Sequence, residues 1–129
     1  MLLQQFINIA FTVGLSSTYG YGEHHCGDYG EPTPCIKGTI TASGDTFDPE
    51  LPTAAIAAPR NLKMVSTVVY MSANGGRCVA ITVNDKMNER YIGKRGFDLS
   101  PGALKALGLE PKPQLLKVEK CNPKGDKND

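Results

Sequence analysis

The sequence predicts an all-β (mainly β) fold: a small barrel of about six short strands, with one short helix at about residues 100–108. Three observations lead to this class. Fourteen glycines and nine prolines in 129 residues favour many turns, and therefore many short strands. Several runs rich in β-branched or small apolar residues end at glycine or proline, and a single stretch carries both the start and the stop signals of a helix. The length is that of one domain.

The predicted strands are separated by turn signals. Pro59 ends one of them, and the "NGG" at 74–76 is typical of a hairpin turn. The strand runs are SSTYGYG (16–22), IKGTITASG (36–44), TAAIAAP (53–59), KMVSTVVYM (63–71), RCVAITVND (77–85) and LLKVEK (115–120). The fifth run alternates most regularly, with Val79, Ile81 and Val83 on one face and Cys78, Ala80 and Thr82 on the other.

The predicted helix follows directly after Asp98. Ser100 is a suitable N-cap, and Pro101 fits the first helical position. Leu104 and Leu107 share one face of the helix, and Gly108 provides the stop signal.

The two ends of the chain differ from the predicted barrel at 16–121. "FINIAFTVGL" (6–15) has the length of a signal-peptide core, but no Lys or Arg precedes it and Asn8 and Thr12 interrupt it. It is too short and too polar to span a bilayer. We interpret 1–15 as either a weak export signal or an ordered arm that docks on another subunit, and 122–129 as a solvated tail.

Four cysteines form an even set, as expected for two disulfides in a secreted or periplasmic domain. Cys26 and Cys35 would close a short proline-containing loop, which leaves Cys78 to pair with Cys121. The alternative is four buried free thiols in a reducing compartment. No CxxC redox spacing is present.

Charge and metal-ligand spacing exclude two classes of partner. Lys and Arg number 14 and acidic residues 13, so the net charge of +1 leaves no electrostatic footprint for nucleic acid. His24, His25, Cys26 and Cys35 match no usual zinc spacing. We expect neither a metal nor a cofactor.

Two carboxylates bracket a basic, glycine-containing loop. Asp85 ends a strand, and we expect it at the rim of the barrel because an unpaired carboxylate is costly in an apolar interior. Asp98 precedes the helix, whose dipole favours the ionised form, although an acid there is more commonly a structural anchor. If folding brings the two together, repulsion raises one pKa and leaves the other group ionised. One proton donor beside one anion is the arrangement used in glycoside cleavage.

Three stretches, "TASGDTFDPELPTAA", "VAITVND" and "GFDLSPGALKALG", resemble in this order the rare lipoprotein A-like double-psi β-barrel domain, and "SSTYG" fits the first strand of that family. The same barrel occurs in bacterial expansins and in family 45 glycoside hydrolases. The resemblance extends from Ser16 to about Cys121. It implies a six-stranded double-psi barrel with a shallow groove for a polysaccharide.

The resemblance also implies a substrate and a site. Bacterial members act on peptidoglycan glycan strands, some of them as lytic transglycosylases. The candidate catalytic acids are Asp85 and Asp98, of which the second corresponds to a proton donor in expansin and hydrolase relatives. Asp45 stands where lytic members usually have glutamate. The candidate substrate contacts are Tyr19, Tyr91, Lys94, Arg95 and His25; Lys94 and Arg95 are either partners of peptide-stem carboxylates or solvated loop charges.

The sequence also departs from the family. Ile56 follows "TAA" where lytic members tend to have histidine, and Lys86-Met87-Asn88 follows "ND" in place of Arg-Gly-Pro. We expect a peptidoglycan-cleaving enzyme that is secreted or located in the periplasm or cell envelope. The departures keep an alternative open: a non-catalytic wall binder or expansin-like loosener, or a structural barrel such as a virion tail component.

Overall fold

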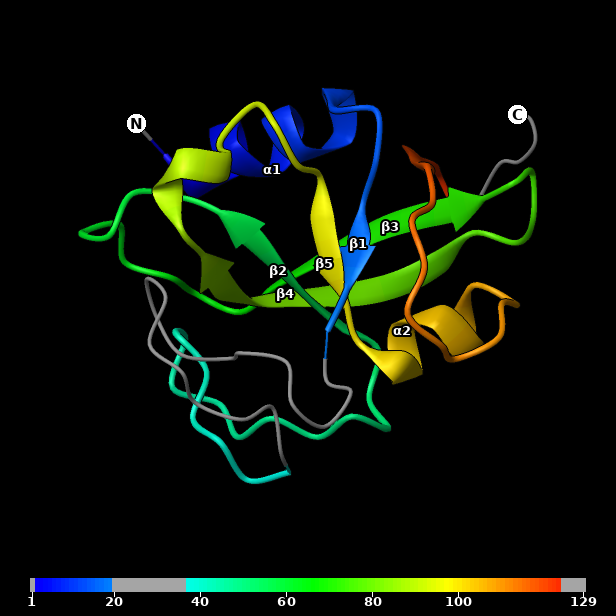
Figure 1. Cartoon of the computed structure of the whole chain (residues 1–129), viewed down its shortest axis with the longest axis horizontal. Coiled ribbons are helices and arrows are strands. Elements are labelled where there is room, and N and C mark those ends of the chain that lie inside the picture. Colours follow the sequence, from blue (N-terminus) through cyan, green and yellow to red (C-terminus); the bar gives the residue numbers. More distant parts are fainter. Residues whose placement is uncertain (1, 20–36, 124–129) are drawn as a thin grey trace.

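The structure is a computed structural model that describes residues 2–19 and 37–123. It shows a curled six-stranded sheet with a helix on each of two sides (Figure 1). The strand order is β1-β5-β2-β4-β3-β6. The strands are β1 (Ser17–Thr18), β2 (Thr53–Ala57), β3 (Thr67–Ala73), β4 (Val79–Met87), β5 (Phe97–Leu99) and β6 (Val118–Lys120). The predicted mainly β class is confirmed.

The two edge strands of the sheet, β1 and β6, are joined through the residues that precede them in the chain. Ser16, just before β1, and Leu116, just before β6, form an antiparallel bridge. The backbone N–H of Ser16 donates to the carbonyl of Leu116 at 2.7 Å, and the N–H of Leu116 donates to the carbonyl of Ser16 at 3.1 Å. This contact joins the edges of the curled sheet, as barrel closure requires.

Strand β2 is the centre of the sheet and is buried along its whole length. It runs parallel to β4 on one side and antiparallel to β5 on the other. Ala54 and Ile56 belong to the main hydrophobic core, whereas Ala55 and Ala57 alternate onto the outer face of the barrel. Burial on both faces explains why residues 54–57, "AAIA", are all apolar.

A β-bulge in β4 determines where Asp85 lies. Ala54 of β2 pairs with Val83, and the next residue, Ala55, pairs with Asp85, so Asn84 is an extra residue in β4. In a regular strand Asp85 would share a face with Val83, which is fully buried in the core. The bulge reverses this alternation and brings Asp85 to the side of Ala55. An inserted residue thereby keeps a carboxylate out of the apolar interior.

The N-terminal segment forms a second α-helix, which the sequence analysis did not predict. Helix α1 (Leu3–Thr12) buries Phe6, Ile7 and Ala10 and lies on one side of the sheet (Figure 1). The ring of Phe11 contacts Phe97 of β5 edge-on, with centroids 4.8 Å apart. The helix thus packs on the chain's own core. Within residues 2–19 and 37–123, no helix is long and apolar enough to cross a bilayer.

Helix α2 (Pro101–Ala106) begins and ends as predicted. Ser100 is the N-cap, and its Oγ accepts from the N–H of Ala103 at 3.1 Å. Gly108, with φ +83°, follows the helix in the left-handed conformation that favours glycine.

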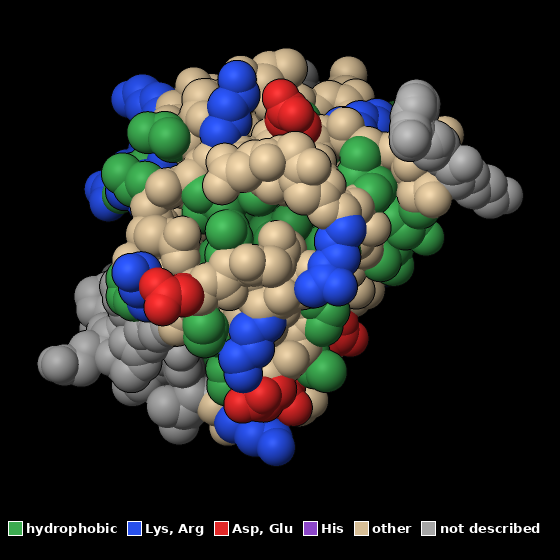
Figure 2. All heavy atoms as spheres, turned by 90° about the vertical axis from the view of Figure 1, so that its right-hand side faces the viewer, with side chains coloured by type: hydrophobic (Ala, Val, Ile, Leu, Met, Phe, Trp, Pro, Cys, Tyr) green, Lys and Arg blue, Asp and Glu red, His purple; other side chains and the backbone are tan. Residues whose placement is uncertain are grey.

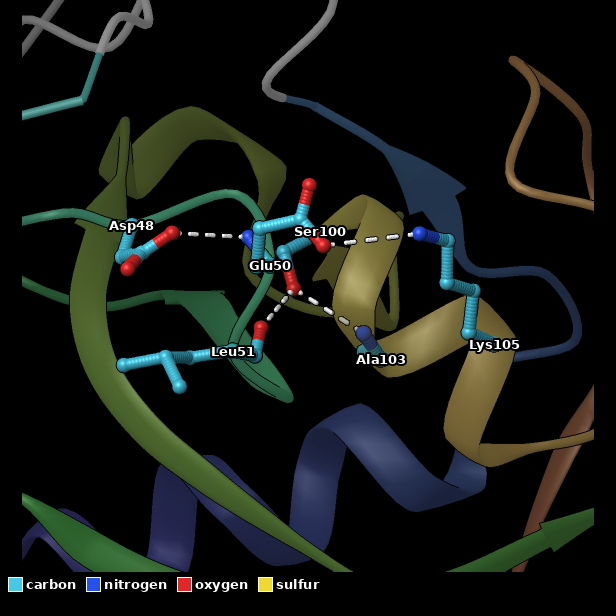
Figure 3. Close-up of polar contacts among 6 residues, drawn as sticks. All are labelled: Asp48, Glu50, Leu51, Ser100, Ala103 and Lys105. Atoms are coloured by element: carbon cyan, nitrogen blue, oxygen red, sulfur yellow. Dashed lines mark hydrogen bonds and ion pairs between the residues drawn. The ribbon is translucent and has the colours of Figure 1, made fainter.

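Ser100 also fastens the start of α2 to the segment that leads into β2. Its Oγ accepts from the N–H of Thr53 at 3.1 Å and donates to the carbonyl of Leu51 at 2.8 Å. Figure 3 shows the contacts of Ser100 with Leu51 and Ala103 beside the ion pair between Lys105 and Glu50, in which Nζ and Oε1 are 3.5 Å apart. A Cβ at Gly102 would overlap the backbone of Glu50 and Leu51, so glycine is required for this close approach. The network fixes β5, and with it Asp98, against β2.

The sequence analysis predicted a strand at 36–44. For residues 37–44, which the structure describes, this prediction was wrong. Residues 37–46 form a turn held by one isolated bridge between Ile40 and Thr46, not a strand. The N–H of Thr41 donates to the carbonyl of Asp45 at 2.8 Å, and Gly44 adopts φ +94°. Because the chain reverses within a few residues, the β-branched residues of this run cannot form an extended ladder.

A disulfide joins Cys78, just before β4, to Cys121, just after β6. The predicted pairing of these two cysteines is confirmed. Cys26 and Cys35 lie outside the described residues, so their pairing stays a prediction.

Charged side chains are spread around one end of the barrel. The face that carries the β3–β4 turn shows Lys and Arg side chains around an apolar centre, with fewer acids (Figure 2). The basic groups stand apart from one another and do not form a continuous stripe. This pattern fits the nearly balanced charge of the chain.

Candidate functional site

The two bracketing carboxylates lie on either side of the same residue. Ala55 of β2 is the register partner of Asp85 in β4 and of Asp98 in β5. The row continues to Ser17 of β1, the partner of Asp98. Since Phe97 and Leu99 are both fully buried, Asp98 alternates onto the outer face. Two strand spacings put the Cα atoms of the acids about 10 Å apart.

Asp98 is half-buried and lines a groove of about 430 Å³. Ser17 Oγ donates to its Oδ1 at 2.9 Å. Tyr19 and Arg95 line the same groove, and residues 113–115 also contribute to its lining. This places one carboxylate beside a space that a sugar could enter.

Asp85 is more enclosed, with 6% of its surface exposed. Its Oδ1 accepts from the backbone N–H of Ala42 at 3.0 Å and from that of Lys86 at 2.9 Å. The turn that contains Ala42 therefore packs over the end of the bulged strand. Backbone donors of this kind favour the ionised form of a carboxylate.

Asp45 lies at the exposed edge of this arrangement. Ser66 Oγ donates to its Oδ2, and the Nδ2 of Asn84 lies 3.5 Å from the same oxygen. Hydrogen bonds from Ser66, then from Ser43 and Asn84, lower the pKa of Asp45. An acid held in its ionised form suits a hydrogen-bond acceptor better than a proton donor.

Tyr19, expected on the wall of the groove, is only 3% exposed. Its ring packs against Phe47, with centroids 5.3 Å apart. Burial, followed by the negative charges of Asp85 and Asp98, raises the pKa of the phenol. The side chain thus stays neutral at physiological pH beside both carboxylates.

Tyr91 lies between two guanidinium groups. Arg90 is 5.0 Å and Arg95 4.8 Å from the centre of its ring. The hydrogen bond and charge of Arg90, and then the charge of Arg95, lower the pKa of Tyr91. Arg95 also approaches Ser17 Oγ at 3.4 Å, which links this cluster to Asp98. Lys94 is exposed on the same loop.

Sequence comparison relates the chain to a known protein. No protein-family model matches the chain. The chain is 34% identical over 96 residues to a protein of Nostoc sp. named "Probable endolytic peptidoglycan transglycosylase RlpA". The chain carries an RlpA-like double-psi β-barrel domain. The match covers 74% of this chain and 22% of the relative, so the chain spans about a fifth of that protein.

The structure brings most of the predicted site residues of the RlpA-like domain together. Asp85 and Asp98 flank β2, Asp45 joins them through Asn84, and Tyr19 and Arg95 share the groove with Asp98. His25 lies outside the described residues, and its role stays a prediction. The catalytic and binding roles of the other residues also stay predictions.

Sequence reasoning missed two residues of this site, Ser17 and Asn84. Ser17 stands two residues before Tyr19 on an extended segment, and this spacing puts both side chains on one face. Asn84 is a poor strand former directly after a regular apolar alternation, which is a local signal for a bulge.

A second groove of the RlpA-like domain, of about 380 Å³, lies between α1 and β3. Phe11, Val68 and Tyr70 contribute to it, and Lys120 is the charged residue in its described lining. Since its described lining includes no carboxylate, acid–base chemistry is better placed in the groove at Asp98.

Proposed function

We propose that the RlpA-like domain cleaves peptidoglycan glycan strands between N-acetylmuramic acid and N-acetylglucosamine as a lytic transglycosylase. The register of β2, which sets Asp85 and Asp98 on either side of Ala55 on the outer face of the barrel, is the observation that carries this proposal. The name of the Nostoc relative supports the substrate and the reaction class.

The different surroundings of the two acids suggest different roles. Asp98 lines the groove and is partly exposed, so it is the proton donor to the glycosidic oxygen. Asp85 accepts two backbone N–H bonds and remains an anion, which stabilises the oxocarbenium-like centre that develops at the muramyl C1.

The ring-closing step uses the Asp98 carboxyl group a second time. As the bond between C1 and the leaving oxygen breaks, that oxygen takes the proton of Asp98. The muramyl 6-hydroxyl then attacks C1 and returns its proton to the Asp98 carboxylate. The product is a 1,6-anhydro sugar, no water is consumed, and Asp98 regains its starting form. Asp45, an exposed acceptor, is placed to hold a sugar hydroxyl.

A substrate of this kind places the domain at the cell envelope, secreted or periplasmic. Helix α1 buries its apolar side on the chain's own sheet. The segment expected as a docking arm therefore has a role within the fold.

One observation favours the alternative of a wall-binding barrel without catalysis. Ile56 stands where the lytic members of the resembled family tend to have histidine, and its side chain is fully buried in the core. The acid pair therefore gains no imidazole partner from that position.

Incubation with purified sacculi separates the two functions. We expect muropeptides with 1,6-anhydromuramyl ends, identified by mass spectrometry. New reducing ends in their place would indicate hydrolysis with water as the nucleophile. Co-sedimentation of the protein with sacculi without any new product would contradict cleavage and support the wall-binding alternative.

A further inference from the structure

The second groove, between α1 and β3, has features of a binding site that the proposed cleavage does not use (Figure 1). Its volume of about 380 Å³ lies in the range of small-molecule sites. Val68 and Tyr70 line it from alternate positions of β3, with 55% and 41% of their surfaces exposed. Apolar and aromatic side chains left open on the wall of a hollow are typical of a surface that receives a ligand.

Helix α1 contributes a pair of amides to the same groove. Gln4 and Asn8 are about one helical turn apart, and both are exposed in the lining. Gln4 Nε2 donates to Asn8 Oδ1 at 3.0 Å. Within residues 2–19 and 37–123, the other two amide atoms, Gln4 Oε1 and Asn8 Nδ2, form no hydrogen bond. The pair therefore presents one acceptor next to one donor, and reversing both amides would leave the same combination.

This combination is complementary to the acetamido group of an N-acetylated sugar. An acetamido group carries one N–H and one C=O, which can pair with the acceptor and the donor of the two amides. The C–H bonds on the apolar face of a sugar ring can pack on the ring of Tyr70. Lys120 also lines the groove and forms no ion pair in the described part of the chain. Its charge is complementary to the carboxylate of muramic acid.

We propose that the groove between α1 and β3 is a second, non-catalytic site that binds an N-acetylated sugar of a glycan strand. The inference rests on the proposed function for the class of glycan. Residues 113–121 contribute to the lining of both grooves, and from Leu115 to Lys120 an extended chain covers at most about 17 Å. A strand held in the second groove is therefore kept at a raised local concentration near Asp98.

NMR titration with the β-1,4-linked tetramer of N-acetylglucosamine tests the site. We expect saturable shifts of the backbone amides of Asn8 and Tyr70. The β-1,4-linked glucose tetramer has a hydroxyl in place of each acetamido group and should bind about tenfold more weakly at Tyr70. Gln4→Ala/Asn8→Ala should weaken binding of the acetylated tetramer by a similar factor, because two neutral hydrogen bonds are lost. Asn61→Ala, which removes an exposed amide from the turn after β2, is the matched control and should bind like the wild type.

Three results would overturn the inference: no saturable shift at Asn8 and Tyr70, equal affinity for the two tetramers, or an unchanged Kd in Gln4→Ala/Asn8→Ala. Shifts of the same amides on dilution without sugar would assign the groove to a second copy of the chain and would also overturn it. Sugar binding in this groove by a protein that releases no muropeptides supports the site and rejects the proposed cleavage alone. Cleavage of sacculi without binding in this groove rejects the second site alone.

Discussion

Asp98→Asn lowers the rate of glycan cleavage by roughly 10²- to 10⁴-fold, the usual contribution of a positioned proton donor. The amide cannot supply a proton to the leaving oxygen, but its carbonyl oxygen can still accept the hydrogen bond from Ser17. We therefore expect the fold to remain intact. Release of muropeptides from sacculi measures the loss, and circular dichroism with thermal unfolding measures the fold.

A carboxylate away from the groove provides the control for this variant. Glu119 lies exposed on β6. Glu119→Gln makes the same change of charge and should cleave at the wild-type rate. Cleavage by Asp98→Asn within a few-fold of the wild type would remove Asp98 from the reaction.

Loss of the disulfide between Cys78 and Cys121 is the largest stability effect that we expect. The two residues are 43 positions apart. The chain-entropy relation for a loop of this length gives about 4 kcal/mol. The Cys78→Ser/Cys121→Ser variant should therefore unfold at a much lower urea concentration. Its m-value should rise, because the unfolded chain is no longer cross-linked.

The same variant tests the other predicted disulfide. Alkylation of the unreduced variant followed by intact mass measurement shows whether Cys26 and Cys35 carry free thiols. No added mass is expected if the two are paired.

A loss of unfolding free energy below about 1 kcal/mol for the Cys78→Ser/Cys121→Ser variant would contradict the entropic account of the first disulfide.

Strongly patterned elements were predictable from the sequence. The alternation of Val79, Ile81 and Val83 fixed the core face of β4, and Ser100, Pro101 and Gly108 marked the two ends of α2. These signals are local, and tertiary packing did not override them. Strand β5 was not predicted because three residues are too few to show a period.

Helix α1 was not predicted because its usual signals are missing. The N-cap residue, Leu2, has an apolar side chain that cannot accept a hydrogen bond from a backbone N–H. The first turn of the helix contains no acidic residue. The buried positions Phe6, Ile7 and Ala10 do have helical spacing, but they lie in a run of apolar residues that also reads as a signal sequence. Packing on the sheet, rather than propensity, stabilises this helix.

The acids of the site were predictable, but their geometry was not. Asp85 stands out in the sequence because it ends an apolar strand pattern, and Asp98 stands out because it directly precedes a helix signal. Their shared partner, Ala55, depends on strands that are distant in the sequence and on a bulge whose location only the pairing reveals. The burial of Tyr19 against Phe47 likewise depends on the turn at 37–46, which the sequence presented as a strand.

The most direct test of the shared site is a double-mutant cycle on the acid pair. It compares release of anhydromuramyl products from sacculi by Asp85→Asn, by Asp98→Asn and by the double variant. If the two carboxylates act in one reaction across Ala55, the double variant loses little more activity than the more damaged single variant. Losses that multiply, or full activity in either single variant, would contradict a joint role for the two acids.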